Sequence, residues 1–340
     1  MRKILAAALA LAVALSLSAC GATKKAETSL FAMDTYMTLV AYGGGADAAL
    51  TDAARAINEL EQKLSRTREG SAVWAVNHDG AAAIDGETST LLKSGLEYSG
   101  ETGGAFDITV APLVDLWAIN SDSPHVPSQA EIDALLPLVG REHVAVDGDT
   151  VTLDAGCAID LGGIAKGYAS DVVAAIFAEH GVKSGTVSLG GNVYVCGSRP
   201  DGKPWNVAVQ DPRSDGYACL LSLSDTFAVT SGGYQRFFTA EDGTVYQHII
   251  DPATGWPARS DLLSVTVVCP SGTRADAYST ALYVMGEADA VRFWEAQRGG
   301  DHAFEAVLIT ADGRLICTPG LVDHFMKQED ASYEVQFLNR

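Results

Sequence analysis

The clearest hydrophobic pattern lies near the start of the chain. It predicts a helix over 47–66, because the apolar residues there recur every three or four positions and share one face: Leu50, Ala54, Ile57, Leu60 and Leu64. The apolar run over 31–42 predicts a first strand before this helix. A second helix is predicted over 89–102. Ser128 and Glu131 have the spacing of a capping box, which predicts the start of a third helix.

Beyond residue 151 the pattern changes to short apolar runs typical of strands. These runs fall at 186–188, 193–196, 205–210, 218–223, 227–230, 245–250 and 263–269. Helices are predicted between them at 165–180, 275–285 and 287–298. Runs of strands with inserted helices indicate an α+β fold rather than a doubly wound sheet. No repeat or linker divides the chain, so 30–328 is predicted to be one catalytic domain, followed by a C-terminal tail over 329–340.

The first residues have the pattern of an export signal. Arg2 and Lys3 precede an apolar run over 4–17, which is shorter than the roughly 20 residues that span a bilayer. The segment 1–19 followed by Cys20 resembles a bacterial lipoprotein signal, in which the cysteine is lipidated. This predicts an exported protein, anchored to the cell membrane outside the cytoplasm, with a tether over 20–29. The alternative is an ordinary signal peptide with an incidental cysteine.

Composition limits the partners and the metals. The 340 residues are 47% hydrophobic and carry a net charge of −20, and removal of residues 1–19 makes the charge two units more negative. A partner such as nucleic acid is therefore not expected. An anionic ligand would need a metal ion, a lysine or a helix N-terminus close to it. The cysteines after Cys20 form no CxxC pair, so buried free thiols are predicted rather than a zinc site, although export would permit a disulfide.

Two glycine-rich segments in the first half carry candidate chemistry. In 102–109, predicted to be a loop entering an apolar strand, Phe106 and Asp107 could give a nucleotide ring an aromatic surface and an acceptor, or form a plain turn. In 158–171, a predicted strand runs into paired glycines and a helix with Lys166 in its first turn. Backbone N–H groups and a lysine at a helix N-terminus suit phosphate. The alternative is a tight connection with a solvated lysine.

Two later segments complete the set. His248, at the end of an apolar run, is either functional or a core histidine with one hydrogen bond. Asp276 and Thr280 lie four residues apart on one helical face, and their oxygens suit a hard cation such as Mg²⁺. Alternatively, Asp276 only partners a cap at Thr273, and Thr280 bonds back to a backbone carbonyl.

Taken in order, five segments resemble the ApbE family of FAD:protein FMN transferases. They read TGGAFDITVAPLVDLW, IDLGGIAKGYASD, VTSGGYQRF, HIIDPATGWP and ADAYSTALYVMG, and the likeness begins at Met33. The resemblance implies an α+β, T-fold-related architecture of mixed, largely antiparallel sheets with inserted helices. It also implies Mg²⁺ as cofactor, FAD as substrate, and transfer of FMN to a threonine or serine hydroxyl of a target protein, with release of AMP. Flavin-carrying subunits of membrane redox complexes are the implied targets.

The resemblance also assigns roles to residues. Metal ligands would be the side chains of Asp276 and Thr280 and the carbonyl of Gly163, where the family often has alanine or serine. FAD contacts would be Met33, Thr67, Ala105, Phe106, Asp107, Asp160, Lys166 and Ile250. Lys166 and the helix N-terminus would stabilise developing charge, and either His248 or Asp251 would accept the proton of the incoming hydroxyl.

Two other functions stay open at this point. A Mg²⁺-dependent FAD pyrophosphatase would use water in place of the protein hydroxyl and give FMN and AMP. A non-catalytic FAD-binding lipoprotein would not require the metal positions at Asp276 and Thr280.

Overall fold

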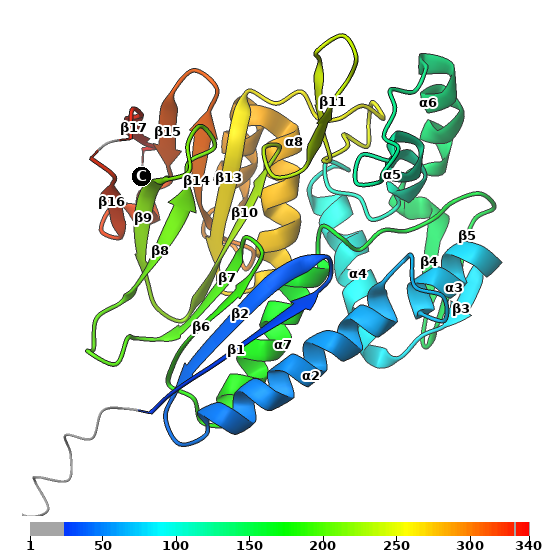
Figure 1. Cartoon of the computed structure of the whole chain (residues 1–340). Helices are drawn as coiled ribbons and strands as arrows, with labels where there is room; N and C mark the ends of the chain where they lie inside the picture. Colours follow the sequence, from blue (N-terminus) through cyan, green and yellow to red (C-terminus); the bar gives the residue numbers. More distant parts are fainter. Residues whose placement is uncertain (1–23, 330, 340) are drawn as a thin grey trace, which may run out of the picture.

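A nine-stranded sheet forms the centre of the molecule in the computed structural model, which describes residues 24–329 and 331–339. Its strands, in spatial order, are β1 (Lys25–Ala32), β2 (Thr35–Tyr42), β6 (Ser184–Leu189), β7 (Asn192–Gly197), β10 (Thr226–Gly232), β13 (Leu262–Cys269), β14 (Glu305–Thr310), β15 (Arg314–Cys317) and β17 (Glu334–Phe337). All neighbouring pairs are antiparallel except β15 with β17. The sheet is drawn from blue through green to red in Figure 1.

Helices cover one face of this sheet. The helices described are α2 (Ala46–Leu64), α3 (Ala72–Asp79), α4 (Gly86–Glu101), α5 (Ala111–Trp117), α6 (Gln129–Leu135), α7 (Ala165–Glu179) and α8 (Gly272–Gln297). Helix α8 packs on β10 and β13, α7 packs beside α8, and α2 packs on the β1–β2 hairpin and α7 (Figure 1). No helix within 24–329 or 331–339 combines the length and the apolar character needed to cross a membrane.

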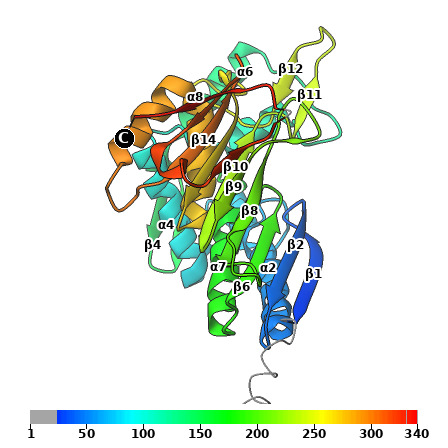
Figure 2. The same ribbon diagram turned by 90° about the vertical axis from the view of Figure 1, so that its left-hand side faces the viewer.

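Small sheets complete the molecule. They comprise β16 (Phe325–Lys327) with β9 (Tyr217–Leu223) and β8 (Trp205–Gln210), then β3 (Ala81–Ala83) with β5 (Thr150–Leu153) and β4 (Val144–Asp147), and the hairpin of β11 (Phe237–Thr239) and β12 (Val245–Gln247). In Figure 2, β8 and β9 lie against the main sheet on the side away from α7. They bury a second core with it, which includes Val195, Leu221 and Ile309.

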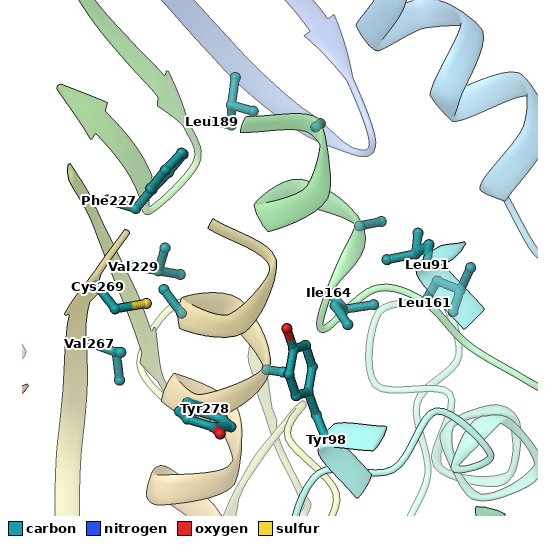
Figure 3. Close-up of a cluster of buried hydrophobic side chains, with 14 of the residues drawn as sticks. Leu91, Tyr98, Leu161, Ile164, Leu189, Phe227, Val229, Val267, Cys269 and Tyr278 are labelled. Carbon is teal, nitrogen blue, oxygen red and sulfur yellow. The ribbon is translucent and has the colours of Figure 1, made fainter. Parts of the chain in front are cut away.

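The main core lies between the sheet and the helices. Figure 3 shows Tyr278 of α8 beside Val229 and Val267 of the sheet, with Tyr98 of α4 on its other side. The Tyr98 and Tyr278 rings meet edge to face with centroids 5.7 Å apart. The Tyr278 hydroxyl donates to Glu101 Oε2 at 2.6 Å, so the buried ring keeps its polar end satisfied. This packing fixes α8, which carries part of the candidate site.

The fold class and most helices agree with the sequence. The α+β architecture with largely antiparallel sheets is confirmed. Helices α2, α4 and α7 match the predicted ranges, and α6 begins with the predicted capping box of Ser128 and Glu131. The helices predicted at 275–285 and 287–298 are two parts of α8 that meet at Gly286, whose φ of 76° is not helical.

The predicted domain ends are wrong in part. The tether over 20–29 overlaps β1, which begins at Lys25 and pairs along its whole length with β2. The tail over 329–340 contains β17, which pairs with β15 in the main sheet. Both segments are short and mostly polar, and for this reason they were not predicted to be strands. A strand at the edge of an antiparallel sheet can form without a continuous apolar run, because only one of its faces is buried.

Three predictions of local structure are also wrong. The strand over 31–42 is interrupted by a turn at Met33 and Asp34. Residues 102–109 lead into α5 rather than a strand, and residues 154–164 before α7 are irregular. These short apolar stretches are held by side-chain hydrogen bonds and turns, which hydrophobic pattern alone does not distinguish from strands.

Candidate active site

A cavity of about 360 Å³ opens where the β1–β2 turn, the start of α7 and the start of α8 converge. It is lined by most residues predicted to be functional: Met33, Ala105, Phe106, Asp107, Asp160, Gly163, Lys166, His248, Ile250, Asp276 and Thr280. These residues come from five segments far apart in the sequence. The structure therefore brings the predicted metal ligands and most predicted FAD contacts to one place.

Asp276 is the buried acid of this cavity. Its side chain is only 4% exposed, and its Oδ2 accepts hydrogen bonds from the Gly167 N–H at 2.8 Å and from Asn192 Nδ2 at 3.0 Å. Among the residues described, it makes no ion pair with a lysine, arginine or histidine. A buried carboxylate without a cation is costly, so this site favours a bound positive ion. The alternative role, as a partner of a Thr273 cap, is wrong, because Ser271 caps α8.

Helices α7 and α8 hold this carboxylate by a close contact between two glycines. A Cβ on Gly167 would lie 2.2 Å from the Gly272 carbonyl oxygen and 2.7 Å from Asp276 Cβ, so only glycine fits. Asp171 of α7 in turn accepts from the N–H groups of Gly272 and Thr273 at the start of α8. Each helix therefore places an acid at the other's positive N-terminal end.

Other oxygen-bearing residues line the cavity together with Asp276. Thr280 Oγ1 lies 3.1 Å from Ser231 Oγ, and a Cβ on Gly163 would lie 3.8 Å from the same threonine oxygen. The alternative, a back-bond from Thr280 to the α8 backbone, is not formed; the Thr280 hydroxyl bonds to Ser231 instead. A carboxylate, a hydroxyl and a backbone carbonyl are the hard oxygen donors that Mg²⁺ prefers. The three predicted metal ligands therefore fit that ion.

Lys166 supplies a cation to the cavity. Its Nζ donates to the Gly162 carbonyl at 3.1 Å, and within the described part of the chain it makes no ion pair with an acid. The expected phosphate-binding N–H groups of α7 are partly occupied, because Gly167 N–H is used by Asp276. Lys166 is thus the main source of positive charge for an anionic ligand at this helix end.

Asp160 is held by backbone and by an arginine that the sequence did not single out. Its Oδ1 accepts from the Gly162 N–H at 2.7 Å, and its Oδ2 pairs with Arg66 Nε at 2.8 Å. Arg66 also binds Asp115 through both of its terminal nitrogens. The predicted contact at Thr67 is not supported, because Thr67 is exposed and does not line the cavity. The neighbouring Arg66 acts there instead, by fixing Asp160.

His248 is placed to accept a proton. Its Nδ1 lies 3.1 Å from the Arg236 carbonyl, which can only accept, so Nδ1 carries the ring proton and Nε2 keeps its lone pair. Burial lowers the pKa of His248 to about 4, with further lowering by the charges of Arg236 and Lys166. The ring is therefore neutral at pH 7. It faces the cavity rather than acting as an ordinary core histidine.

Asp251, the alternative base, has a different role. Its Oδ1 accepts from the Ala253 N–H at 2.9 Å and its Oδ2 from the Thr254 hydroxyl at 2.8 Å, which stabilises the turn after His248. Among the described residues it is not part of the cavity lining. The structure therefore does not support Asp251 as the base.

The β1–β2 turn at the cavity edge is strained. Met33 and Asp34 have φ values of 50° and 56°, as in a type I′ turn, although neither is the glycine or asparagine that such turns favour. The Met33 N–H donates to Glu61 Oε1 at 2.9 Å, which holds the turn against α2. Non-glycine residues in this conformation cluster at functional sites, because the surroundings must compensate for the strain.

Phe106 and Asp107 also line the cavity. A Cβ on Gly163 would lie 3.2 Å from the Phe106 ring, so glycine keeps the ring close to the predicted metal ligands. Asp107 accepts from the Thr109 N–H and hydroxyl and from Ser99 Oγ. Its carboxylate thus organises the loop in which Phe106 lies.

Other cavity residues were not predicted from the sequence. They include Asn192, which orients Asp276, Ser231 beside Thr280, and Arg236, which bonds the Asp34 carbonyl at 2.7 Å. Ser231 and Arg236 lie in the segment TSGGYQR, which was already distinctive, whereas Asn192 follows a plain turn and gave no signal.

The cysteines agree with the sequence. Cys157, Cys196, Cys219, Cys269 and Cys317 are free and buried, as predicted. Burial raises the pKa of Cys269 to about 11 and that of Cys219 to about 12, so these thiols are unreactive. Cys20, the predicted lipidation site, lies outside the described residues.

Comparisons with known proteins agree with this geometry. The model of the ApbE family matches residues 33–304, a range that contains every cavity residue named above. An FAD:protein FMN transferase of Vibrio cholerae is 34% identical over 256 residues, covering 73% of this chain and 76% of the relative. One of Treponema pallidum is 34% identical over 297 residues, covering 81% of each chain.

A solved structure also resembles the whole fold. The crystal structure of the ApbE protein from Thermotoga maritima superposes with a TM-score of 0.79 at 30% identity. The superposition covers 92% of this chain and all of that one. The likeness therefore extends over the cavity and the sheets that hold it.

Proposed function

The chain belongs to the ApbE family, and on that premise we propose that its cavity catalyses Mg²⁺-dependent transfer of FMN from FAD to a protein hydroxyl. The chain is a flavin transferase, as its relatives are. The observation that supports the metal dependence is the buried Asp276, which shares the cavity with Thr280 and Gly163 and has no cationic partner among the described residues.

The metal would be held by the Asp276 carboxylate, the Thr280 hydroxyl and the Gly163 carbonyl. When bound, Mg²⁺ would neutralise charge on the pyrophosphate of FAD. The glycine contact between α7 and α8 keeps the carboxylate in place, and Asn192 fixes its orientation. These residues are preorganised, so little reorganisation is needed during the reaction.

The remaining residues act on the substrate and the proton. The oxygen of a threonine or serine hydroxyl attacks the FMN-side phosphorus, and the bond from that phosphorus to the AMP oxygen breaks. His248 Nε2 accepts the hydroxyl proton, while Lys166 stabilises charge on the phosphoryl oxygens. Phe106, Ala105, Met33 and Ile250 offer apolar surface to the flavin nucleotide, and Asp160 offers an acceptor.

The transfer can be tested directly. The full-length protein in detergent is mixed with FAD and Mg²⁺, with and without a peptide that carries a single threonine, and AMP and peptide mass are measured. Peptide-dependent AMP release with an FMN-sized mass gain is expected. AMP and free FMN without the peptide would indicate a pyrophosphatase instead, and FAD left intact in both samples would indicate a carrier.

We also propose the cellular setting that the sequence predicts. The segment 1–19 and Cys20 support export and lipid anchoring on the outer side of the cell membrane. Membrane redox complexes with flavin-carrying subunits would then be the targets, since they lie in the same membrane.

A further inference from the structure

Two aromatic side chains are exposed side by side at the end of the β1–β2 hairpin. Phe31 and Tyr36 are each 68% exposed, and they are direct partners in the β1–β2 register. Directly paired residues of antiparallel strands place their side chains on the same face, within contact distance. Single exposed apolar residues are common, but an adjacent aromatic pair forms a continuous apolar patch.

This pair lies next to the cavity. Of the four residues between Phe31 and Tyr36, the turn residues Met33 and Asp34 and the first β2 residue, Thr35, line the cavity. Gly190 packs against the same turn, because a Cβ there would lie 2.2 Å from Thr35 Cγ2. The aromatic pair therefore lies at the rim of the cavity, beside a turn that lines it.

A second hairpin adds apolar surface to the same rim. In β11 and β12, Phe237 is 53% exposed and Val245 is 58% exposed, and the register places them on one face. Phe237 follows Arg236, which also lines the cavity and pairs with Asp34 Oδ2 at 2.6 Å. This ion pair joins the two hairpins. Within this pair the two charges compensate each other.

We propose that this rim, Phe31 and Tyr36 with Phe237 and Val245, binds an apolar segment of the acceptor protein on either side of the hydroxyl that receives FMN. The inference rests on the proposed function, because flavin transfer requires a polypeptide to reach the cavity. The segment crosses the Asp34–Arg236 pair, its hydroxyl enters the cavity, and its flanking apolar side chains lie on the aromatic groups.

The position of the rim favours a protein segment over lipid or a second copy of the chain. The β1 strand has eight residues, so its exposed tip lies about 25 Å from Lys25, the end that leads to the proposed anchor. Figure 1 shows the described N-terminal end of β1 at the opposite end of the hairpin from this tip. A dimer through the rim would also block the cavity that the acceptor must enter.

The test compares two acceptor peptides and three forms of the full-length protein in detergent. Each peptide has one central threonine, flanked by leucine and valine in one and by glutamine and asparagine in the other. The forms are wild type, Phe31→Ser with Tyr36→Ser, and the control Val322→Ser with Met326→Ser. The control residues are exposed to 40% and 41%; Met326 lies in β16 and Val322 three residues before that strand, and neither is part of the cavity lining.

We expect wild type to label the apolar peptide with a higher kcat/KM than the polar peptide. The double variant at Phe31 and Tyr36 should lose about tenfold in kcat/KM for the apolar peptide, as is typical when central aromatic contacts of an interface are removed. Its KM for FAD should stay unchanged, because neither side chain lines the cavity. The control should behave as wild type.

Several outcomes would overturn the inference. Equal labelling of both peptides by wild type, or an unchanged double variant, would leave the transferase standing and remove the acceptor role of the rim. A defect seen only in lipid vesicles would assign the rim to the membrane, and a changed sedimentation coefficient with unchanged kinetics would assign it to a dimer. If wild type labels neither peptide, the proposed function fails as well.

Discussion

At the scale of single residues, the charge of Asp276 can be separated from its hydrogen bonds. Asp276→Asn keeps an oxygen that can accept from Gly167 and Asn192, but it removes the negative charge that a cation requires. We expect AMP release in Mg²⁺ to fall by at least about a hundredfold, because metal charge stabilisation is worth several kcal/mol. Mg²⁺ should raise the melting temperature of wild type and leave that of the variant unchanged.

A matched control is Asp171→Asn, which changes the other acid of the helix pair. Asp171 accepts from two N–H groups at the start of α8 but does not line the cavity, so this variant should melt at a lower temperature and still respond to Mg²⁺. A normal Mg²⁺ response in Asp276→Asn would remove the metal assignment.

His248 predicts a dependence of stability on pH. Its pKa is about 4 in the folded protein and about 6.5 in the unfolded chain, so the unfolded state binds more protons between these values. Stability is therefore fully present above pH 6.5 and is lost as the pH falls toward 4. The expected loss from this group between pH 7 and pH 5 is about 2 kcal/mol. Urea unfolding of wild type and His248→Gln at both pH values measures it.

The same histidine gives an expectation for activity. Since the ring stays neutral well below pH 6.5, transfer should continue down to about pH 5, and His248→Gln should be slower by about a hundredfold or more at pH 7. His78→Gln, a change of an exposed histidine on α3, should alter neither property. An unchanged rate in His248→Gln would mean that His248 has only a structural role.

At the scale of elements, the crossing of α7 and α8 holds the residues of the proposed metal site. Gly167→Ala would place a methyl group against the Gly272 carbonyl and Asp276, which forces the helices apart. We expect a loss of about 1–3 kcal/mol in the free energy of unfolding, typical of overpacking. Mg²⁺ should also bind more weakly, because the Gly167 N–H that holds Asp276 moves.

Gly86→Ala is the matched control, since Gly86 is also in the first turn of a helix. A Cβ there meets no atom within 4 Å, so stability should be unchanged or slightly higher. Thermal melts with and without Mg²⁺ compare the two variants. Equal melting behaviour of the two variants would mean that the helix crossing does not require glycine at position 167.

The elements also show what the sequence could predict. Helix α2 has a regular apolar face and α6 a capping box, and both are local signals that the sequence contains in full. The turn at Met33 and Asp34 was not predicted, because its residues lack the glycine or asparagine that marks such turns. The turn is imposed by pairing of β1 with β2 and by Glu61 on α2, contacts that lie outside the local pattern.

The residues of the candidate site also fall into those that the sequence could predict and those that it could not. Asp276, Thr280 and Lys166 lie in distinctive segments and were predicted, whereas Asn192 and Arg66 act through partners distant in the sequence. Spacing along the chain cannot reveal a pair such as Arg66 with Asp160. It also could not decide between His248 and Asp251, because only the folded turn shows that both Asp251 oxygens are engaged.

At the scale of the whole molecule, an acidic protein must attract an anionic substrate. The net charge of −20 repels FAD over long distances, so binding depends on local positive charge in the cavity. Lys166 supplies part of it, and a cation beside Asp276 would supply the rest. The repulsion keeps other anions away as well, which leaves the local arrangement to determine selectivity.

The proposed anchor would hold the whole molecule at the membrane surface. Since β1 already begins at Lys25, the five residues from Cys20 to Lys24 could separate it from the bilayer by at most about 18 Å. We expect wild type in bacterial cells to incorporate radiolabelled palmitate and to sediment with membranes, and Cys20→Ala to do neither. Cys157→Ala, which removes a buried thiol, should still be labelled. Membrane association that survives Cys20→Ala without palmitate would instead mean that an uncleaved N-terminal segment holds the enzyme in the bilayer.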